Sequence, residues 1–349
     1  MIDTDYGFLD AQLRMLGEND EQFRTLSLNL NRMEKDFSQQ LAHWRESLFS
    51  FSVAQWLEVL RFNTTVDTVT VDLSLSETTI WKKDHLKCLM IAIGCLPKLK
   101  RLVIRQNNLG QPRRLAPVQA IVAAVRRAHQ IECLELWGNE IIVPSVQKPL
   151  TELTQVILEE CTQLKSFKVA GFHLNHNHVA MFTPLMTLPH LTEFGLGNTS
   201  DGFEPVAKML SSCPNIRTLT LSFVDQLEDA DCMALVQALK RNQQLQILSL
   251  LNTENNANAS SGISPRCQRA LIQMLEHGNM TLQELKTRGD VNAEIQLYLK
   301  LNRAGRQDLF QQHDSLPSRE LWVDTLIASR DDLDCSFYFL TMNPSICAT

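Results

Sequence analysis

A short apolar spacing recurs along the chain and limits what it can fold into. In IECLELWGNEI (residues 131–141) the apolar residues Ile131, Leu134 and Leu136 are three and then two positions apart, and a turn-forming Gly138-Asn139 pair follows. Eight segments share this spacing and start at Val66, Leu99, Ile131, Leu164, Leu191, Ile216, Leu245 and Leu282. Such regular recurrence is the signature of a solenoid built from stacked repeats.

The segments between these motifs have helical periodicity. Residues 117–130 (PVQAIVAAVRRAHQ) and 229–243 (DADCMALVQALKRNQ) carry apolar residues three and four positions apart, with Pro or Asp near the start. Each unit is therefore expected to be one strand and one helix, because neither element buries its apolar side alone. The predicted fold is an α/β solenoid, a horseshoe with a parallel sheet on the concave face and helices on the convex face.

Two segments carry a family resemblance. LKRLVIRQNNL (residues 99–109) and IECLELWGNEI, with long helices between them, resemble leucine-rich repeat proteins of the ribonuclease-inhibitor-like type. The resemblance covers about residues 62–290 and implies a leucine-rich repeat solenoid that binds a protein on its concave face. It implies no particular activity, since the fold serves inhibitors, immune receptors, GTPase activators and ligase adaptors.

A solenoid also needs ends that shield its apolar core. We therefore divide the chain into an N-terminal helical cap (residues 1–61), the solenoid (62–290) and a C-terminal helical cap (291–349), although FRTLSL (23–28) also fits a strand. The tail resembles that of uncharacterised algal leucine-rich repeat proteins in LNRAGR (301–306), Trp322 and FYFLTMNPSIC (337–347). Apolar tail residues such as Trp322, Phe337 and Phe339 are expected to lie buried.

Composition and charge narrow the possible functions. The chain has 33 basic and 39 acidic residues, a net charge of −6, which disfavours nucleic-acid binding. It has no apolar run long enough to span a membrane, and the start, MIDTDYGFLD, is unlike a leader. We therefore expect a cytoplasmic protein that makes no membrane contact and is monomeric when free.

Cysteines and glycosylation motifs agree with that location. The nine cysteines are an odd number without a C-x-x-C pair, so we expect reduced, mostly buried thiols. Four N-x-[ST] motifs start at Asn63, Asn198, Asn258 and Asn279. Without a leader they are interpreted as chance matches.

Few motifs indicate chemistry. His173, His176 and His178 in HLNHNH could offer three imidazoles to a metal, but more ordinarily are polar residues of a loop after a strand. The arginine pairs 113–114 and 126–127 could bind an anion, but more often are solvated charges. The chain contains no nucleophile elbow, zinc-protease or kinase signature, so we predict a protein that is not an enzyme and holds no cofactor or metal.

The alternate residues of the strands are expected to line the concave face. A partner site is predicted there at Arg101, Arg105, Glu135, Trp137 and Lys168. Arg and Trp are enriched at binding hot spots, although Trp137 could equally pack against the loop beneath it. The favoured function is a non-catalytic interaction scaffold. The alternative is a regulatory adaptor of the GTPase-activating or ubiquitin-ligase-adaptor type, which presents a partner to an enzyme.

Overall fold

The computed structural model describes residues 16–22, 24–30, 54, 57–73, 83–106, 115–138, 144–170, 174–199, 203–211, 213–223, 228–252, 263–287, 290–310 and 319–343. Nine strands form one sheet in chain order, and every neighbouring pair with a described register is parallel. The chain divides into two compact units, Met1–Gly197 and Asn198–Thr349. We describe each unit by itself.

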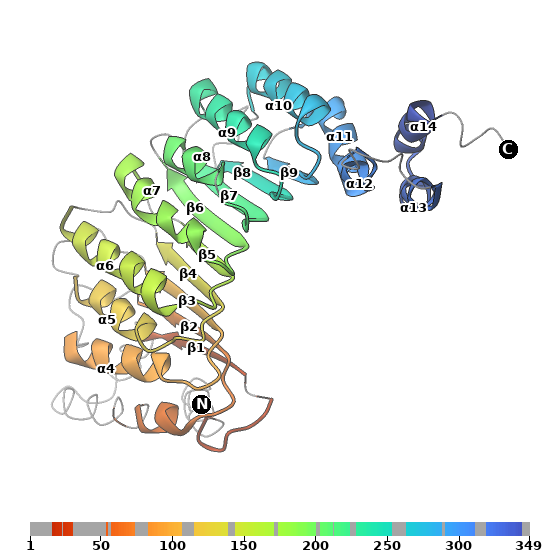
Figure 1. Ribbon diagram of the computed structural model, residues 1–349. Coiled ribbons are helices and arrows are strands. Elements are labelled where there is room, and N and C mark those ends of the chain that lie inside the picture. Colours follow the sequence, from red (N-terminus) through yellow and green to blue (C-terminus); the bar gives the residue numbers. More distant parts are fainter. Residues whose placement is uncertain are drawn as a thin grey trace, which may run out of the picture. The chain divides into compact units, whose positions relative to one another are not determined.

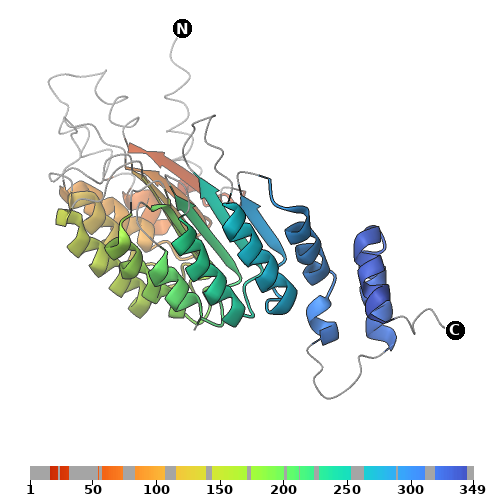
Figure 2. The same ribbon diagram turned by 90° about the horizontal axis from the view of Figure 1, so that it is seen from above.

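The first unit alternates strands and helices. Its strands are β1 (Thr25–Asn29), β2 (Thr68–Asp72), β3 (Arg101–Gln106), β4 (Cys133–Gly138), β5 (Ser166–Ala170) and most of β6 (Glu193–Thr199). Its helices are α4 (Lys83–Gly94), α5 (Leu115–Val125), α6 (Pro144–Glu160), α7 (His176–Phe182) and the 3-10 helix η1 (Thr183–Thr187). The α-helices lie in one layer on one side of the strands (Figures 1 and 2). We call the other side of the sheet the open face.

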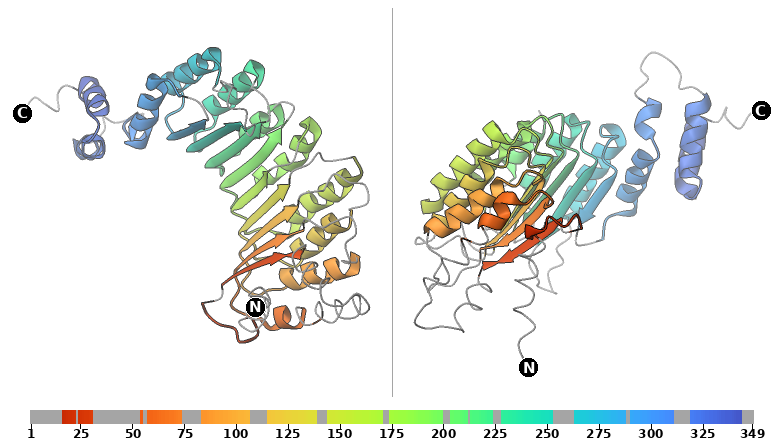
Figure 3. Two further views of the ribbon diagram at one scale, coloured as in Figure 1. Left: turned by 180° about the vertical axis from the view of Figure 1, so that it is seen from behind. Right: turned by 90° about the horizontal axis from the view of Figure 1, so that it is seen from below.

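The second unit continues the alternation and ends in helices. It contains β7 (Thr218–Phe223), β8 (Ile247–Asn252) and β9 (Glu284–Thr287), with α8 (Glu204–Leu210), α9 (Asp229–Arg241) and α10 (Pro265–His277) between and beside them. Four helices follow: α11 (Ala293–Arg303), α12 (Arg306–Phe310), α13 (Arg319–Ser329) and α14 (Leu333–Met342) (Figure 3).

The repeated apolar residues form the core, as the spacing predicts. The middle motif residues Leu102, Leu134, Phe167, Leu219 and Leu248 are at most 1% exposed. Burial of each such side chain contributes roughly 1.5–3 kcal/mol. The strand–helix alternation and this buried motif identify the fold as a leucine-rich repeat solenoid. The ribonuclease-inhibitor-like subtype stays a prediction.

A ninth strand lies within the segment expected to be a helical cap. β1 pairs in parallel with β2, and its residues alternate between exposed and buried. At this point the alternative interpretation of residues 23–28 as a strand describes the structure better than the helical cap does. The boundaries of the three-part division stay predictions.

Neighbouring repeats are joined by shared main-chain acceptors where each strand begins. The carbonyl oxygen of Lys100 accepts the N–H groups of Glu132 and Cys133 at 2.8 and 2.9 Å. The carbonyl oxygen of Glu132 accepts those of Lys165 and Ser166 at 2.8 and 3.0 Å. This pattern sets the register of each new strand on the previous one.

Buried asparagines connect the helix ends of some repeats to the following strand. The side-chain amide of Asn279 donates to the carbonyl oxygens of Leu239 and Asn242 at 2.8 and 2.9 Å. Its Oδ1 accepts the N–H groups of Thr281 and Leu282 at 3.1 and 2.8 Å. One side chain therefore satisfies four main-chain groups that would otherwise be buried without partners.

Asn63 and Asn242 occupy the same place, three residues before the first apolar residue of their motifs. Through Oδ1 each accepts two backbone N–H groups, and its side-chain amide donates to one carbonyl oxygen at Asn63 and to two at Asn242. Two of the four N-x-[ST] motifs are thus structural. Asn63 and Asn279 are at most 1% exposed, so the folded chain offers neither as a glycosylation site. Asn258 lies outside the described residues.

A glycine at the end of α4 allows a close approach to α5. A Cβ atom at Gly94 would lie 2.2 Å from the carbonyl oxygen of Ala124. Only a residue without a side chain allows the end of α4 to approach α5 this closely.

The tail segment LNRAGR (residues 301–306) closes the last repeat, and its resemblance to algal leucine-rich repeat proteins stays a prediction. Arg303 Nη2 donates to the carbonyl oxygen of Gln283 at 3.0 Å. Earlier carbonyls at this position accept N–H groups from a following repeat, so the guanidinium takes the place of that repeat. The side-chain amide of Asn302 donates to the carbonyl oxygens of Asn279 and Leu282, as the buried asparagines of earlier repeats do.

The rest of the motif caps α10. Gly305 has a φ of +97°, in the left-handed region that favours glycine. Arg306 is 3% exposed, and its two terminal nitrogens donate to the carbonyl oxygens of Leu275 and Glu276 at 2.9 and 2.7 Å. A cation there also opposes the negative end of the α10 dipole.

The tail helices share a small core with α11. Its buried members are Leu301, Leu309, Trp322, Cys335 and Phe339. Trp322 and Phe339 are buried as expected, but the expectation for Phe337 is wrong, because its side chain is 70% exposed. Phe337 lies on the side of α14 away from this core.

The cysteines differ from expectation at one pair. Cys232 on α9 and Cys267 on α10 form a disulfide bond, with Cα atoms 6.0 Å apart. The two residues hold similar places on the helices of consecutive repeats, which explains their proximity. The sequence did not predict this pair, because it does not show how the two helices are aligned. Cys161, Cys213 and Cys335 are free and buried, while Cys88 and Cys95 are free and exposed.

Candidate functional site

The five predicted partner-binding residues lie on three adjacent strands of the first unit. The strand register places Arg105 of β3 opposite Trp137 of β4, as predicted, and Glu135 of β4 opposite Lys168 of β5. Arg101 begins β3. Their alternation with buried motif residues directs these side chains to the open face. We call Arg101, Arg105, Glu135, Trp137 and Lys168 the β3–β5 patch.

Glu135 is the centre of the patch. Its side chain is only 7% exposed, and Oε1 lies 2.5 Å from Arg101 Nη2. The other carboxylate oxygen, Oε2, accepts the indole N–H of Trp137 at 3.0 Å. A buried carboxylate is costly without partners, and here each oxygen has one. Glu135 therefore holds both neighbouring side chains in place.

Trp137 keeps much of its ring in solvent. The residue is 43% exposed although its indole N–H is bonded within the patch. Residues 139–143, the loop against which Trp137 could equally pack, lie outside the described residues. The structure presents an aromatic surface whose direction is fixed by its polar end.

Lys168 forms an ion pair with Glu193 on β6 rather than with Glu135, which lies opposite it on β4. Its Nζ lies 3.4 Å from Glu193 Oε2 on β6. The same oxygen accepts a hydrogen bond from Ser166 Oγ at 2.9 Å. The acid and base groups at this end of the patch are therefore bonded to each other, and their charges largely offset.

Three residues that support the patch were predicted to line the same face but were not included in the predicted partner site: Cys133, Ser166 and Glu193. Cys133 Sγ lies 3.7 Å from Glu135 Oε1, and burial together with this carboxylate raises the pKa of the thiol. Cys133 therefore stays a thiol at neutral pH and is unsuited to nucleophilic chemistry. The alternation of strand residues was the available signal for all three, but spacing does not show which side chains bond.

One histidine of the cluster, His178, has a structural role at α7. Asn175 and His178 form a capping box: Asn175 Oδ1 accepts the His178 N–H at 3.0 Å, and His178 Nδ1 accepts the Asn175 N–H at 3.3 Å. Burial lowers the pKa of His178, so the imidazole is neutral at pH 7. His176 is exposed on the same helix, and His173 lies outside the described residues.

Only one of the two arginine pairs lies within the described residues. Arg126 Nη2 lies 2.9 Å from Glu152 Oε1, in an exposed ion pair on the helix side of the sheet. Arg113 and Arg114 lie outside the described residues. Arg126 and Arg127 are both exposed and directly follow α5, away from the open face. They therefore serve as control positions for the patch.

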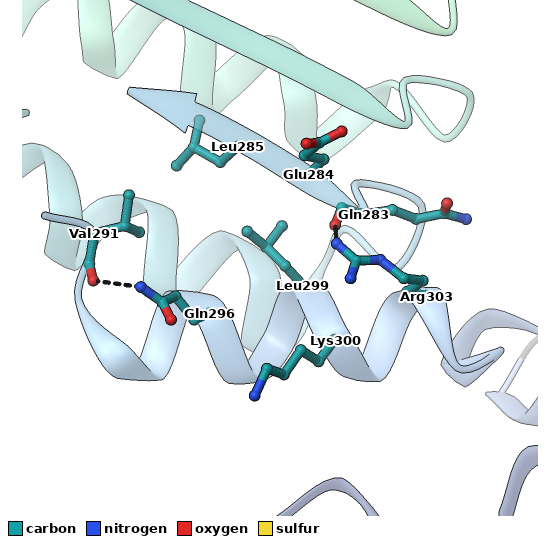
Figure 4. Close-up of a pocket in the computed structure, with 8 residues that line it drawn as sticks. All are labelled: Gln283, Glu284, Leu285, Val291, Gln296, Leu299, Lys300 and Arg303. Atoms are coloured by element: carbon teal, nitrogen blue, oxygen red, sulfur yellow. Dashed lines mark hydrogen bonds between the residues drawn. The ribbon is translucent and has the colours of Figure 1, made fainter. Parts of the chain in front are cut away.

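A pocket of about 220 Å³ lies between β9 and α11 in the second unit (Figure 4). Its walls include Leu285 and Leu299, and Gln296 Nε2 donates to the carbonyl oxygen of Val291 at 3.1 Å. Arg303 closes one end by its bond to Gln283. Its described lining residues include no Ser, Cys or His that could act as nucleophile or general base. We interpret the pocket as part of the closing structure of the last repeat.

The described residues contain no group of three or more His, Cys, Asp or Glu side chains placed to hold a metal ion. Among the described helices, none is both long and apolar enough to cross a membrane.

Comparison with known proteins gives similarity to solved structures only. No protein-family model and no curated protein matches the chain. Similar structures include internalin C2 from Listeria monocytogenes, at 14% identity and a TM-score of 0.31, covering 59% of this chain and 71% of that one. A chain of the Rad7 and Elc1 complex in yeast has 12% identity and a TM-score of 0.48, covering 92% and 80%. The L. monocytogenes internalin inlF has 13% identity and a TM-score of 0.27, covering 70% and 73%.

These similarities are too distant to carry an argument about function. All three identities lie below 25% and all three TM-scores below 0.5. The assignment of the fold rests on the ordered sheet and the buried repeat residues, and the assignment of a site rests on the patch itself.

Proposed function

We propose that this chain is a non-catalytic interaction scaffold whose protein partner binds the open face at the β3–β5 patch. The observation that carries the proposal is the exposed Trp137 ring held by the buried Glu135 carboxylate. Tryptophan is among the residue types most enriched at binding hot spots. An exposed ring whose orientation is already fixed loses little conformational freedom when a partner covers it.

The charged side chains around the Trp137 ring favour specificity of binding over long-range electrostatic attraction. Arg101 is satisfied by Glu135, and Lys168 by Glu193, so these side chains present paired charges. Exposed Arg105, opposite Trp137 in the register, adds a guanidinium beside the ring. We propose that Trp137 and Arg105 make the principal contacts, while Arg101, Glu135 and Lys168 fix their surroundings.

A regulatory adaptor would use the same surface to hold the protein that it presents to an enzyme. The proposal therefore concerns where the partner binds and leaves its pathway open. The expected cytoplasmic location, the monomeric free state and the absence of nucleic-acid, cofactor and metal binding also stay predictions.

The proposal is tested by comparing captured partners of three tagged proteins. Wild type, the Trp137→Ala/Arg105→Ala double variant and the Arg126→Ala/Arg127→Ala control are purified from the same cells, and bound proteins are quantified by mass spectrometry. At least one specific partner should fall by about tenfold or more with the patch variant and persist with the control.

The opposite pattern would contradict the proposal. If specific partners persist with the patch variant and disappear with the Arg126→Ala/Arg127→Ala control, the partner uses the helix side of the sheet. Both variants should still fold, because no substituted residue belongs to the buried motif. The patch variant should melt at a lower temperature than the control, because Trp137→Ala removes the donor to the buried Glu135 Oε2.

A further inference from the structure

Two tail helices expose large apolar side chains to solvent. Leu333 and Phe337 on α14 are 84% and 70% exposed, and Val323 and Ile327 on α13 are 41% and 55% exposed. We call these four residues the α13–α14 apolar face. Several large exposed apolar residues on two consecutive helices differ from singly scattered ones, and such concentrations are typical of interaction sites.

The helical spacing gathers these residues into two stripes. Val323 and Ile327 are four positions apart, as are Leu333 and Phe337, so the members of each pair lie on one side of their helix. Buried Trp322 lies on another side of α13, and buried Phe339 on another side of α14. Figure 3 shows the two helices as neighbours, and Ser336 Oγ donates to the carbonyl oxygen of Ser329 at 2.9 Å where they meet.

The core does not account for this outer apolar surface. One side of α14 is covered within the unit, where Phe339 and Cys335 join Leu301 and Trp322. A helix covered on one side normally carries polar residues on the other, whereas a helix that is apolar all round is covered all round. The outer side of α14 therefore has the composition of a surface that a partner covers.

The surrounding charge indicates which kind of partner fits. Residues 320–343 contain the carboxylates of Glu320, Asp324, Asp331, Asp332 and Asp334. The basic residues of the two helices and the turn between them are Arg319, the first residue of α13, and Arg330, whose Nε lies 3.8 Å from Asp331 Oδ1. Lys300 of α11 pairs with Asp332, 2.5 Å from its Oδ2. Asp324 and Asp334 are exposed beside the two stripes.

We propose that the α13–α14 apolar face binds a basic amphipathic helix of a partner protein. Such a helix offers apolar side chains at spacings of three and four to the stripes and lysine or arginine to the carboxylates beside them. An anionic lipid surface would be repelled by the same carboxylates. A second copy of the face would bring the same charges together.

The probe is a synthetic amphipathic helix of leucine and lysine, titrated into the full chain by calorimetry. Binding should weaken by at least about tenfold in the Leu333→Ser/Phe337→Ser variant, which removes one stripe. Phe62→Ser is the matched control, because Phe62 is a similarly exposed aromatic residue, 64% exposed, in the other unit. It should bind the probe as wild type does. Asp324→Asn/Asp334→Asn should weaken binding and reduce its dependence on salt.

Comparison probes identify other occupants. A peptide with glutamate in place of lysine should not bind, and vesicles containing phosphatidylserine should not bind. Equal binding of the glutamate peptide, binding to vesicles without binding to the lysine peptide, or binding unaffected by the Leu333→Ser/Phe337→Ser variant would overturn the proposal. Self-association in sedimentation that this variant abolishes would instead identify a second copy as the occupant.

A stability measurement tests whether the face is free in the chain. Phe337→Ser should leave the melting temperature near that of wild type, whereas Phe339→Ser should lower it strongly, because Phe339 is fully buried. Equal losses for both variants would show that Phe337 is already covered within the chain and would overturn the proposal.

Discussion

Glu135 shows how a single buried charge determines the local arrangement of the candidate site. Its carboxylate is almost fully removed from water, whereas its partner Arg101 is 49% exposed. The two residues are therefore unequal. Removing Arg101 leaves a buried carboxylate with the indole N–H of Trp137 as its main donor, while removing the charge of Glu135 leaves a guanidinium that water can solvate.

We therefore expect a larger loss of stability on substitution of Arg101 than on substitution of Glu135. Arg101→Met should lower the free energy of unfolding by about 2 kcal/mol, and Glu135→Gln, which keeps an acceptor for Trp137, by less than about 1 kcal/mol. Urea denaturation of both variants measures the difference. Arg126→Met, which breaks an exposed pair, should cost at most about 0.5 kcal/mol. A larger cost for Glu135→Gln than for Arg101→Met would contradict this account of the patch.

His178 gives the fold a pH dependence. Burial lowers its pKa below the usual imidazole value, so the unfolded chain takes up the proton first as the pH falls through about 6.5. Stability from the neutral imidazole is thus present above that pH and lost below it. Acidification from about pH 7.5 to about pH 5.5 should lower the melting temperature of wild type more than that of His178→Gln, which keeps the capping box. Parallel pH profiles for the two proteins would refute this assignment.

At the scale of elements, the apolar periodicity predicted the strands of the repeats more reliably than it predicted the structure of the two end segments of the chain. The middle residue of each predicted motif lies buried on a strand, because the apolar spacing and the parallel register report the same packing. β1 was harder to assign because its alternating residues stand in a segment rich in helical signals. The asparagine positions are visible as N-x-x-L, but the acceptors of Arg306 lie about thirty residues earlier. No local pattern shows such a contact.

Arg306 should be essential to the closing element. Its guanidinium bonds two carbonyl oxygens at the end of α10 and lies 5.1 Å from the ring centre of Tyr298. Lysine keeps the charge but cannot reproduce the fork or the planar contact. Arg306→Lys should lower the free energy of unfolding by about 2 kcal/mol or more. Arg330→Lys, at a site 74% exposed, is the control and should cost at most about 0.5 kcal/mol by the same urea titration. Similar losses at both positions would show that Arg306 is not a specific cap.

For the whole molecule, the sequence predicts where a partner surface can lie but not how it is organised. Alternation along β3 and β4 placed Arg105, Glu135 and Trp137 on one face, and the register confirms the alignment of Arg105 with Trp137. The burial of Glu135 and its two bonds depend on neighbouring strands, so residue spacing does not reveal them. The exposure of Phe337 also reversed an expectation based on apolarity alone.

Site-specific photo-crosslinking tests the central claim most directly. Ala170 of β5 lies opposite Trp137 in the register, so Ala170→benzoylphenylalanine places a reactive group beside the proposed anchor without removing it. Arg126→benzoylphenylalanine is the control on the helix side. Irradiation in cells should give a discrete protein adduct at position 170, and adding Trp137→Ala should remove it. An adduct at position 126 alone, or one at 170 that persists undiminished in the Trp137→Ala background, would contradict partner binding at the β3–β5 patch.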